Sequence, residues 1–121
     1  PDYGEPALTD RIDRMVTVCL ADVCFRSTHV LLKPNLISAR HGPLACTEVA
    51  FILATARWFV DQGARVCIGD SPAFGTASGV LAKLGIVEQL RSLSVPITDF
   101  DRVNTVTLAS GKKAGLAADA M

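Results

Sequence analysis

Residues 65–76 read Arg-Val-Cys-Ile-Gly-Asp-Ser-Pro-Ala-Phe-Gly-Thr, and this stretch decides the fold. Its first four residues form a short apolar segment typical of a strand, which the loop beginning at Gly69 interrupts. Gly75 and Thr76 then lead into a helical pattern. Ligands of α/β proteins bind outside the carboxyl ends of strands, where such a strand-to-helix corner lies. We therefore expect one edge of a binding site here.

A matching strand and a helix precede this stretch. Residues 28–33 (Thr-His-Val-Leu-Leu-Lys) contain three consecutive apolar residues, which is typical of a strand in a parallel sheet, and Pro34 ends it. Apolar residues at helical spacing follow from Val49 to Val60, with Thr47 as the predicted N-cap and Gly63 at the C-terminal cap. Strand, helix and strand in this order predict a βαβ unit with a right-handed crossover.

The remaining segments extend this unit at both ends. A helix is predicted over Leu8–Val23, a helix break at Gly85, a third strand over Val95–Phe100 and a half-exposed edge strand over Asn104–Ala109. The stripe expected to pack in the core from the first helix is Leu8, Ile12, Met15, Val16, Cys19, Leu20 and Val23. We predict a single α/β domain over residues 1–121, with a mostly parallel sheet in a three-layer, Rossmann-like arrangement.

Composition excludes several classes of partner. The 121 residues include 12 basic and 12 acidic side chains and no basic cluster, so we expect no binding to nucleic acid or to an anionic membrane. No apolar run approaches the roughly 20 residues that a membrane span requires. The first residues lack the basic and apolar regions of a signal peptide, and we therefore expect a cytoplasmic protein.

The four cysteines, Cys19, Cys24, Cys46 and Cys67, do not show the spacing of a metal site. No pair has the C-x-x-C spacing of zinc or redox sites, and the clustered spacings of iron–sulphur ligands are missing. We interpret them as reduced structural thiols, and we predict no metal ligands in this chain.

The candidate site combines residues from both strand ends. If the two strands are parallel neighbours, Lys33 and Asn35 lie beside Asp70 and Ser71 at one edge of the sheet. The loop ending at Thr76 offers backbone N–H groups that suit an anion. Lys33 supplies a positive charge, and Asp70 is suited to accept a proton, orient a hydroxyl or bind a hard metal ion.

A purely structural interpretation of these residues stays open. Asp70, Ser71 and Pro72 also fit a simple turn with side-chain capping, and Lys33 also fits a solvated charge at a strand end. The sequence lacks G-x-G-x-x-G, a P-loop, G-x-S-x-G and H-E-x-x-H. The expected fold is therefore Rossmann-like without a nucleotide fingerprint, and neither a reaction nor a catalytic residue can be assigned.

Three segments together resemble a known family. Residues 30–36 (Val-Leu-Leu-Lys-Pro-Asn-Leu), 47–49 (Thr-Glu-Val) and 66–72 (Val-Cys-Ile-Gly-Asp-Ser-Pro) are similar in order and spacing to the motifs of the prokaryotic "domain of unknown function 362" family. The resemblance extends from about Thr28 to Asp101. It departs at Thr47, which Glu48 follows directly, without the family's intervening Pro.

The resemblance implies a redox context and a longer domain. Many members of that family are fused to, or occur with, ferredoxin-type iron–sulphur modules, so an iron–sulphur cluster is expected in a partner or in a segment absent from this chain. The family domain is usually longer, and the chain is expected to be a fragment of it. A fragment exposes apolar surface, which favours association into a homo-oligomer.

Two functional hypotheses from different classes follow. The first is a redox-associated domain that binds a small anionic or metal-bound ligand at the carboxyl ends of its strands, through Lys33, Asn35, Asp70, Ser71 and Thr76. The second is a non-catalytic binding or assembly module in which these motifs serve turn geometry. An independent hydrolase or transferase is a weaker third alternative.

Overall fold

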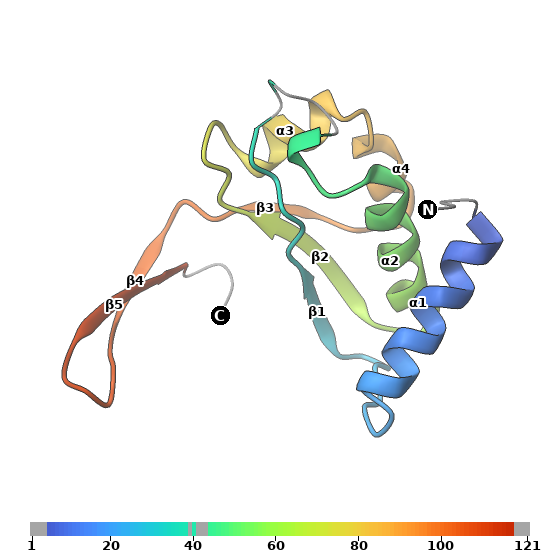
Figure 1. The fold of residues 1–121 in the computed structure, drawn as a ribbon, viewed down its shortest axis with the longest axis horizontal. Coiled ribbons are helices and arrows are strands. Elements are labelled where there is room, and N and C mark those ends of the chain that lie inside the picture. The colour runs from blue at the N-terminus through green and yellow to red at the C-terminus, as the bar shows by residue number, and fades with distance from the viewer. Residues whose placement is uncertain (1–4, 39, 41–43, 118–121) are drawn as a thin grey trace.

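A parallel sheet with helices packed against it forms the body of the protein, and a separate hairpin extends from it (Figure 1). The computed structural model describes residues 5–38, 40 and 44–117. Its elements are α1 (Glu5–Cys19), β1 (His29–Leu32), α2 (Val49–Asp61), β2 (Arg65–Asp70), α3 (Ala77–Lys83), α4 (Val87–Ser92), β3 (Ile97–Asp99), β4 (Val103–Thr107) and β5 (Lys113–Ala117).

The predicted βαβ unit is confirmed. The sheet order is β1-β2-β3, and both pairs of neighbours are parallel. Leu32 in β1 lies opposite Ile68 in β2, and Asp70 lies opposite Asp99 in β3. The three strands therefore end at one edge of the sheet, as an α/β fold requires.

The core lies between the sheet and the helices. Ile68 of β2 and Ile52 of α2 are buried, and α2 separates the sheet from α1 (Figure 1). The indole Nε1 of Trp58 donates to Asp13 at 3.0 Å and ties α2 to α1. Helices and sheet thus share one continuous hydrophobic cluster.

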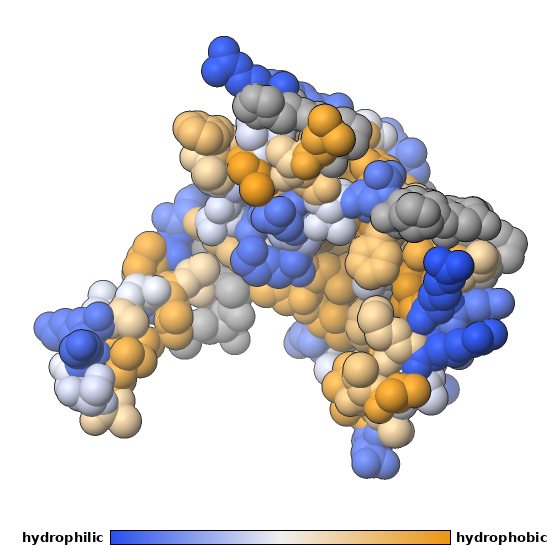
Figure 2. All heavy atoms as spheres, in the orientation of Figure 1, coloured by the Kyte–Doolittle hydropathy of each residue, from blue (hydrophilic) through white to orange (hydrophobic). Residues whose placement is uncertain are grey.

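Side chains alternate between the two faces of the sheet. Val66 and Ile68 are buried on the side of α2, whereas Leu31 and Cys67 lie outside the core cluster and are half-buried. Figure 2 shows hydrophobic surface over this part of the sheet. A mixed α/β fold with a parallel sheet is confirmed, and the three-layer arrangement stays a prediction because the described core lies on the α2 side.

Two details of the helices differ from expectation. The first helix ends at Cys19 rather than Val23, and four residues of its predicted core stripe are exposed: Met15, Cys19, Leu20 and Val23. Thr47 is not the N-cap of α2: Glu48 holds that position without a side-chain cap, and the Thr47 hydroxyl instead accepts from a distant backbone N–H. This hydrogen bond links the two ends of the connection between β1 and α2, which a local helix cap would not do.

The C-terminal segment forms an antiparallel hairpin of β4 and β5. The strand predicted over Asn104–Ala109 is found as β4, but it ends at Thr107 and pairs with β5 in a separate two-stranded sheet, so it is not an edge strand of the parallel sheet. The strand β5 was not predicted. Val103 is 70% exposed and Leu116 is 45% exposed. The hairpin extends away from the helices in Figure 1 and buries few of its own side chains.

Candidate ligand-binding site at the sheet edge

Lys33 and Asp70 meet at the carboxyl ends of β1 and β2. Lys33 Nζ lies 2.7 Å from Asp70 Oδ1, with the lysine side chain 59% exposed and the aspartate 5% exposed. The parallel pairing of β1 with β2 brings the two residues to the same edge. The structure therefore joins the two central residues of the predicted site in an ion pair.

Both oxygens of the Asp70 carboxylate have partners. Oδ2 accepts a hydrogen bond from the backbone N–H of Leu36 at 2.9 Å, while Oδ1 contacts Lys33. The Asp70 side chain is only 5% exposed, which restricts access of a metal ion or a substrate to the remaining lone pairs of the carboxylate. The described residues include no group of three or more His, Cys, Asp or Glu side chains arranged to hold a metal ion. Asp70 is thus placed to position Lys33 and the loop after β1.

Asn35 contributes through its backbone. Its N–H donates to Thr47 Oγ1 at 2.9 Å, and its carbonyl accepts from Thr47 N at 2.8 Å. This reciprocal pair, with the bridge between Leu36 and Cys46, closes the connection from β1 to α2. The Asn35 residue itself is exposed beside Lys33. Residues 39 and 41–43 of this connection lie outside the described residues.

Backbone N–H groups at the start of α3 have hydrogen-bond partners within the chain. The Thr76 hydroxyl caps the helix by accepting from Gly79 N at 3.1 Å. The carboxylate of Asp99 accepts from Ser78 N at 2.9 Å and from Ser78 Oγ at 2.8 Å. An internal carboxylate therefore occupies the position that the sequence analysis offered to an anion. Ser71 lies exposed just after Asp70.

Gly69 permits close packing of the strand beneath the site. A Cβ atom at this position would lie 2.6 Å from Cε1 of Phe100 and 2.7 Å from the carbonyl oxygen of Thr98. The Phe100 N–H in turn donates to the Asp70 carbonyl at 3.2 Å. The glycine that precedes Asp70 is thus required by the approach of β3.

A cavity of about 110 Å³ adjoins Lys33. It lies between the carboxyl end of β1 and the first turns of α2, and its walls are mainly apolar. Thr47, Phe51 and Thr55 line it from the side of α2. The Thr55 hydroxyl is buried without a hydrogen-bond partner. Such a group costs free energy unless a water or ligand satisfies it.

Phe51 and Thr55 were not among the predicted site residues, and Thr47 was predicted only as a cap. A signal was present for Phe51 and Thr55, because they are spaced by four and share one face of the predicted helix. Thr47 lies before α2, and only the fold places it beside them.

The four cysteines are dispersed over the fold. Cys19 and Cys24 are exposed, and Cys46 and Cys67 are half-buried, all as free thiols. Burial raises the pKa of the Cys67 thiol above its ordinary value of 9.0. The described residues therefore do not fit an iron–sulphur cluster, which requires thiolates gathered at one point.

Comparisons with known proteins identify a family and a relative of this chain. The family model described as "Domain of unknown function (DUF362)" matches residues 30–120. A thylakoid-associated protein of Synechocystis sp. is 40% identical over 72 residues, which are 59% of this chain and 22% of that protein. The match therefore spans about a fifth of the relative's length. No solved structure matches the chain significantly. None of the described helices has the length and apolar character of a membrane span.

Proposed function

The chain belongs to the DUF362 family, and from the geometry of its sheet edge we propose that it binds a small anionic ligand through Lys33. The single observation that carries this proposal is the ion pair of Lys33 with the buried Asp70, beside a cavity of about 110 Å³. Asp70 is the positioning residue, because its two oxygens are held by Lys33 and by the Leu36 N–H. The anionic ligand is preferred over a metal-bound one because the Lys33 ammonium is the accessible partner of the pair, with its side chain 59% exposed against 5% for Asp70.

Lys33 has the properties of a ligand contact. An ammonium group has three donors, and its contact with Asp70 leaves donors directed to solvent or ligand. The side chain is 59% exposed, so a ligand reaches it without rearrangement of the sheet. Asn35 and Ser71 lie on the same edge and are proposed as peripheral contacts, and Thr76 as a more distant one at the start of α3.

The test is a titration of the isotope-labelled 121-residue chain with acetate and with inorganic phosphate at constant ionic strength. We expect saturable amide shifts at residues 33–36 and at Thr47, and their loss in Lys33→Gln. Lys113→Gln is a matched control, because Lys113 lies in the hairpin. Absence of saturable shifts with either anion, or equal shifts in Lys33→Gln, would overturn the proposal.

A redox association is proposed on the resemblance alone. An iron–sulphur protein or fused module would be the partner, and the thylakoid association in the relative's name is compatible with such a setting. Anaerobic purification of the full-length gene product with iron and sulphide analysis tests it. If the purified protein contains no iron and no neighbouring or fused domain carries a cluster, the alternative of an assembly module is favoured.

The alternative, a non-catalytic assembly module, is favoured by exposed apolar surface. Leu108 and Leu116 are 48% and 45% exposed at the hairpin, and Leu31 and Cys67 lie half-buried on the sheet face outside the core cluster. A second helical layer over that face would complete the three-layer, Rossmann-like arrangement that we propose for the longer family domain. Sedimentation of the chain at several concentrations distinguishes a homo-oligomer from a monomer. Cytoplasmic location stays a prediction.

A further inference from the structure

We propose that the cavity beside Lys33 binds the alkyl chain of a short monocarboxylate, whose carboxylate contacts the Lys33 ammonium and the Thr47 hydroxyl. This inference rests on the proposed function and names its ligand class. It commits the cavity to a ligand with one negative charge and about four carbons. The first argument below disfavours larger anions, the second disfavours more highly charged ones, and the third places the carboxylate.

The first argument is the composition of the cavity wall. Leu32, Pro34 and Ile68 line it from the sheet, and Phe51 and Ile52 line it from α2. Such a wall favours an apolar group over water. A dry apolar cavity of about 150 Å³ holds benzene, with its six carbons. On that scale the 110 Å³ cavity holds roughly four carbons.

The second argument is charge. Lys33 and Asp70 together are formally neutral, because the carboxylate lies 2.7 Å from the ammonium. Lys33 therefore offers a ligand hydrogen-bond donors, while the net positive charge at the site is small. A doubly charged phosphate gains less here than at a lysine without a carboxylate partner, since the nearby Asp70 charge opposes it. A monocarboxylate carries the smallest charge that still uses the ammonium donors.

The third argument is the placement of hydroxyl donors. Thr47 Oγ1 accepts from Asn35 N, so its own proton remains to be donated. Thr47 lines the same cavity as Lys33, which allows the two to contact the two oxygens of one carboxylate. Thr55 also lines the cavity, and its hydroxyl oxygen is buried without a hydrogen-bond partner.

The experiment measures affinity along a series of acetate, propionate, butyrate and octanoate, with inorganic phosphate for comparison. Burial of each methylene is worth about fourfold in affinity, so we expect butyrate to bind about 15-fold more tightly than acetate. Octanoate should gain little beyond butyrate, because its additional carbons remain outside the cavity. Filtered nuclear Overhauser effects between the butyrate methyl and the Phe51 ring should place the chain.

Two variants separate the cavity from the charge. Thr55→Leu fills the cavity, and we expect acetate affinity to persist while the gain for butyrate disappears. Thr55→Val keeps the volume and should retain that gain. Butyrate binding no tighter than acetate would overturn this inference and leave anion binding at Lys33 intact. Phosphate binding more tightly than butyrate would do the same, and failure of every anion would overturn both proposals. If Thr55→Leu fails to fold, the acetate-to-butyrate ratio of the unmodified chain still decides.

Discussion

Asp70 contacts two residues that follow the neighbouring strand β1: its Oδ1 lies 2.7 Å from Lys33 Nζ, and its Oδ2 accepts the Leu36 N–H at 2.9 Å. One carboxylate at the end of β2 therefore fixes both the first side chain after β1 and the loop that continues from it. The two contacts differ in burial, because Leu36 is buried and Lys33 is largely exposed. This difference separates the structural role of Asp70 from the ligand contact of Lys33.

The two contacts of Asp70 predict different costs for two substitutions. Asp70→Ala leaves the buried Leu36 N–H without an acceptor, and we expect it to lower the free energy of unfolding by about 2–3 kcal/mol. Asp70→Asn keeps an oxygen for Leu36 and loses the pair with an exposed lysine, so about 1 kcal/mol is expected. Urea unfolding measures both. Equal losses in the two variants would show that the Leu36 bond contributes little.

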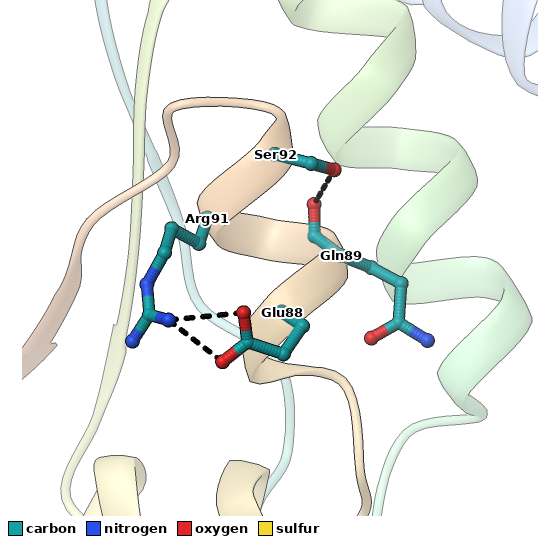
Figure 3. Close-up of polar contacts among 4 residues, drawn as sticks. All are labelled: Glu88, Gln89, Arg91 and Ser92. Carbon is teal, nitrogen blue, oxygen red and sulfur yellow. Dashed lines mark hydrogen bonds and ion pairs between the residues drawn. The ribbon is translucent and has the colours of Figure 1, made fainter.

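Breaking the exposed ion pair of α4 should lower the free energy of unfolding much less than Asp70→Ala does. This pair is therefore a matched control for the buried carboxylate. Arg91 Nη1 lies 2.7 Å from Glu88 Oε1, with side chains that are 71% and 76% exposed (Figure 3). A solvated pair at this helical spacing contributes only about 0.3–0.5 kcal/mol. Glu88→Gln should therefore change the urea midpoint far less than Asp70→Ala. A comparable loss of stability in both variants would mean that burial does not determine how much these ion pairs contribute.

Gly69 predicts a steric effect that is independent of charge. Gly69→Ala places a methyl group 2.7 Å from the Thr98 carbonyl oxygen and 2.6 Å from the Phe100 ring. Backbone in a paired strand cannot withdraw easily, so we expect a loss of about 1–3 kcal/mol in thermal or urea unfolding. The difference in stability between Phe100→Ala and the double variant Gly69→Ala/Phe100→Ala measures the clash with the Thr98 carbonyl oxygen alone, because the ring is absent from both. If adding the methyl costs nothing in the Phe100→Ala background, the ring rather than the carbonyl causes the strain.

The pairing of Lys33 with Asp70 could be predicted because it follows from topology. Each residue ends an apolar segment, and parallel neighbours end at one edge of a sheet. The βαβ unit was readable for the same reason, since its helical spacing and strand composition are local signals. The binding site of five residues stays a prediction.

Hydrogen bonds between residues far apart in the chain could not be predicted from the sequence. The Thr47 hydroxyl bonds to Asn35 N, 12 residues away, and Asp99 bonds to Ser78, 21 residues away. The sequence pattern predicts Thr47 as a local cap and places Asp99 in a strand, and only the fold reveals their partners. The β5 strand was missed because its sequence, Lys-Ala-Gly-Leu-Ala, has weak strand propensity and depends on pairing with β4.

The raised pKa of Cys67 predicts a loss of stability at alkaline pH. Its folded-state pKa lies above the ordinary value of 9.0 because burial disfavours the thiolate. The folded state then holds its proton more tightly than the unfolded state, so the free energy of unfolding falls as the pH rises through and above 9. Cys67→Ala should reduce this decline. In labelling with iodoacetamide, Cys67 should react more slowly than the exposed Cys19 and Cys24, and equal rates would contradict the burial.

The hairpin predicts weak protection of its amides from hydrogen exchange. A two-stranded hairpin is marginally stable in water unless it packs against other elements, and most side chains of β4 and β5 are exposed. Amides in 103–107 and 113–117 should therefore exchange far faster than those of β2, whose residues are largely buried between α2 and two parallel neighbours. Protection equal to that of β2 would mean that another surface covers the hairpin. Repeating the measurement at low protein concentration then identifies that surface, because protection by a second copy of the chain declines on dilution and protection within one chain does not.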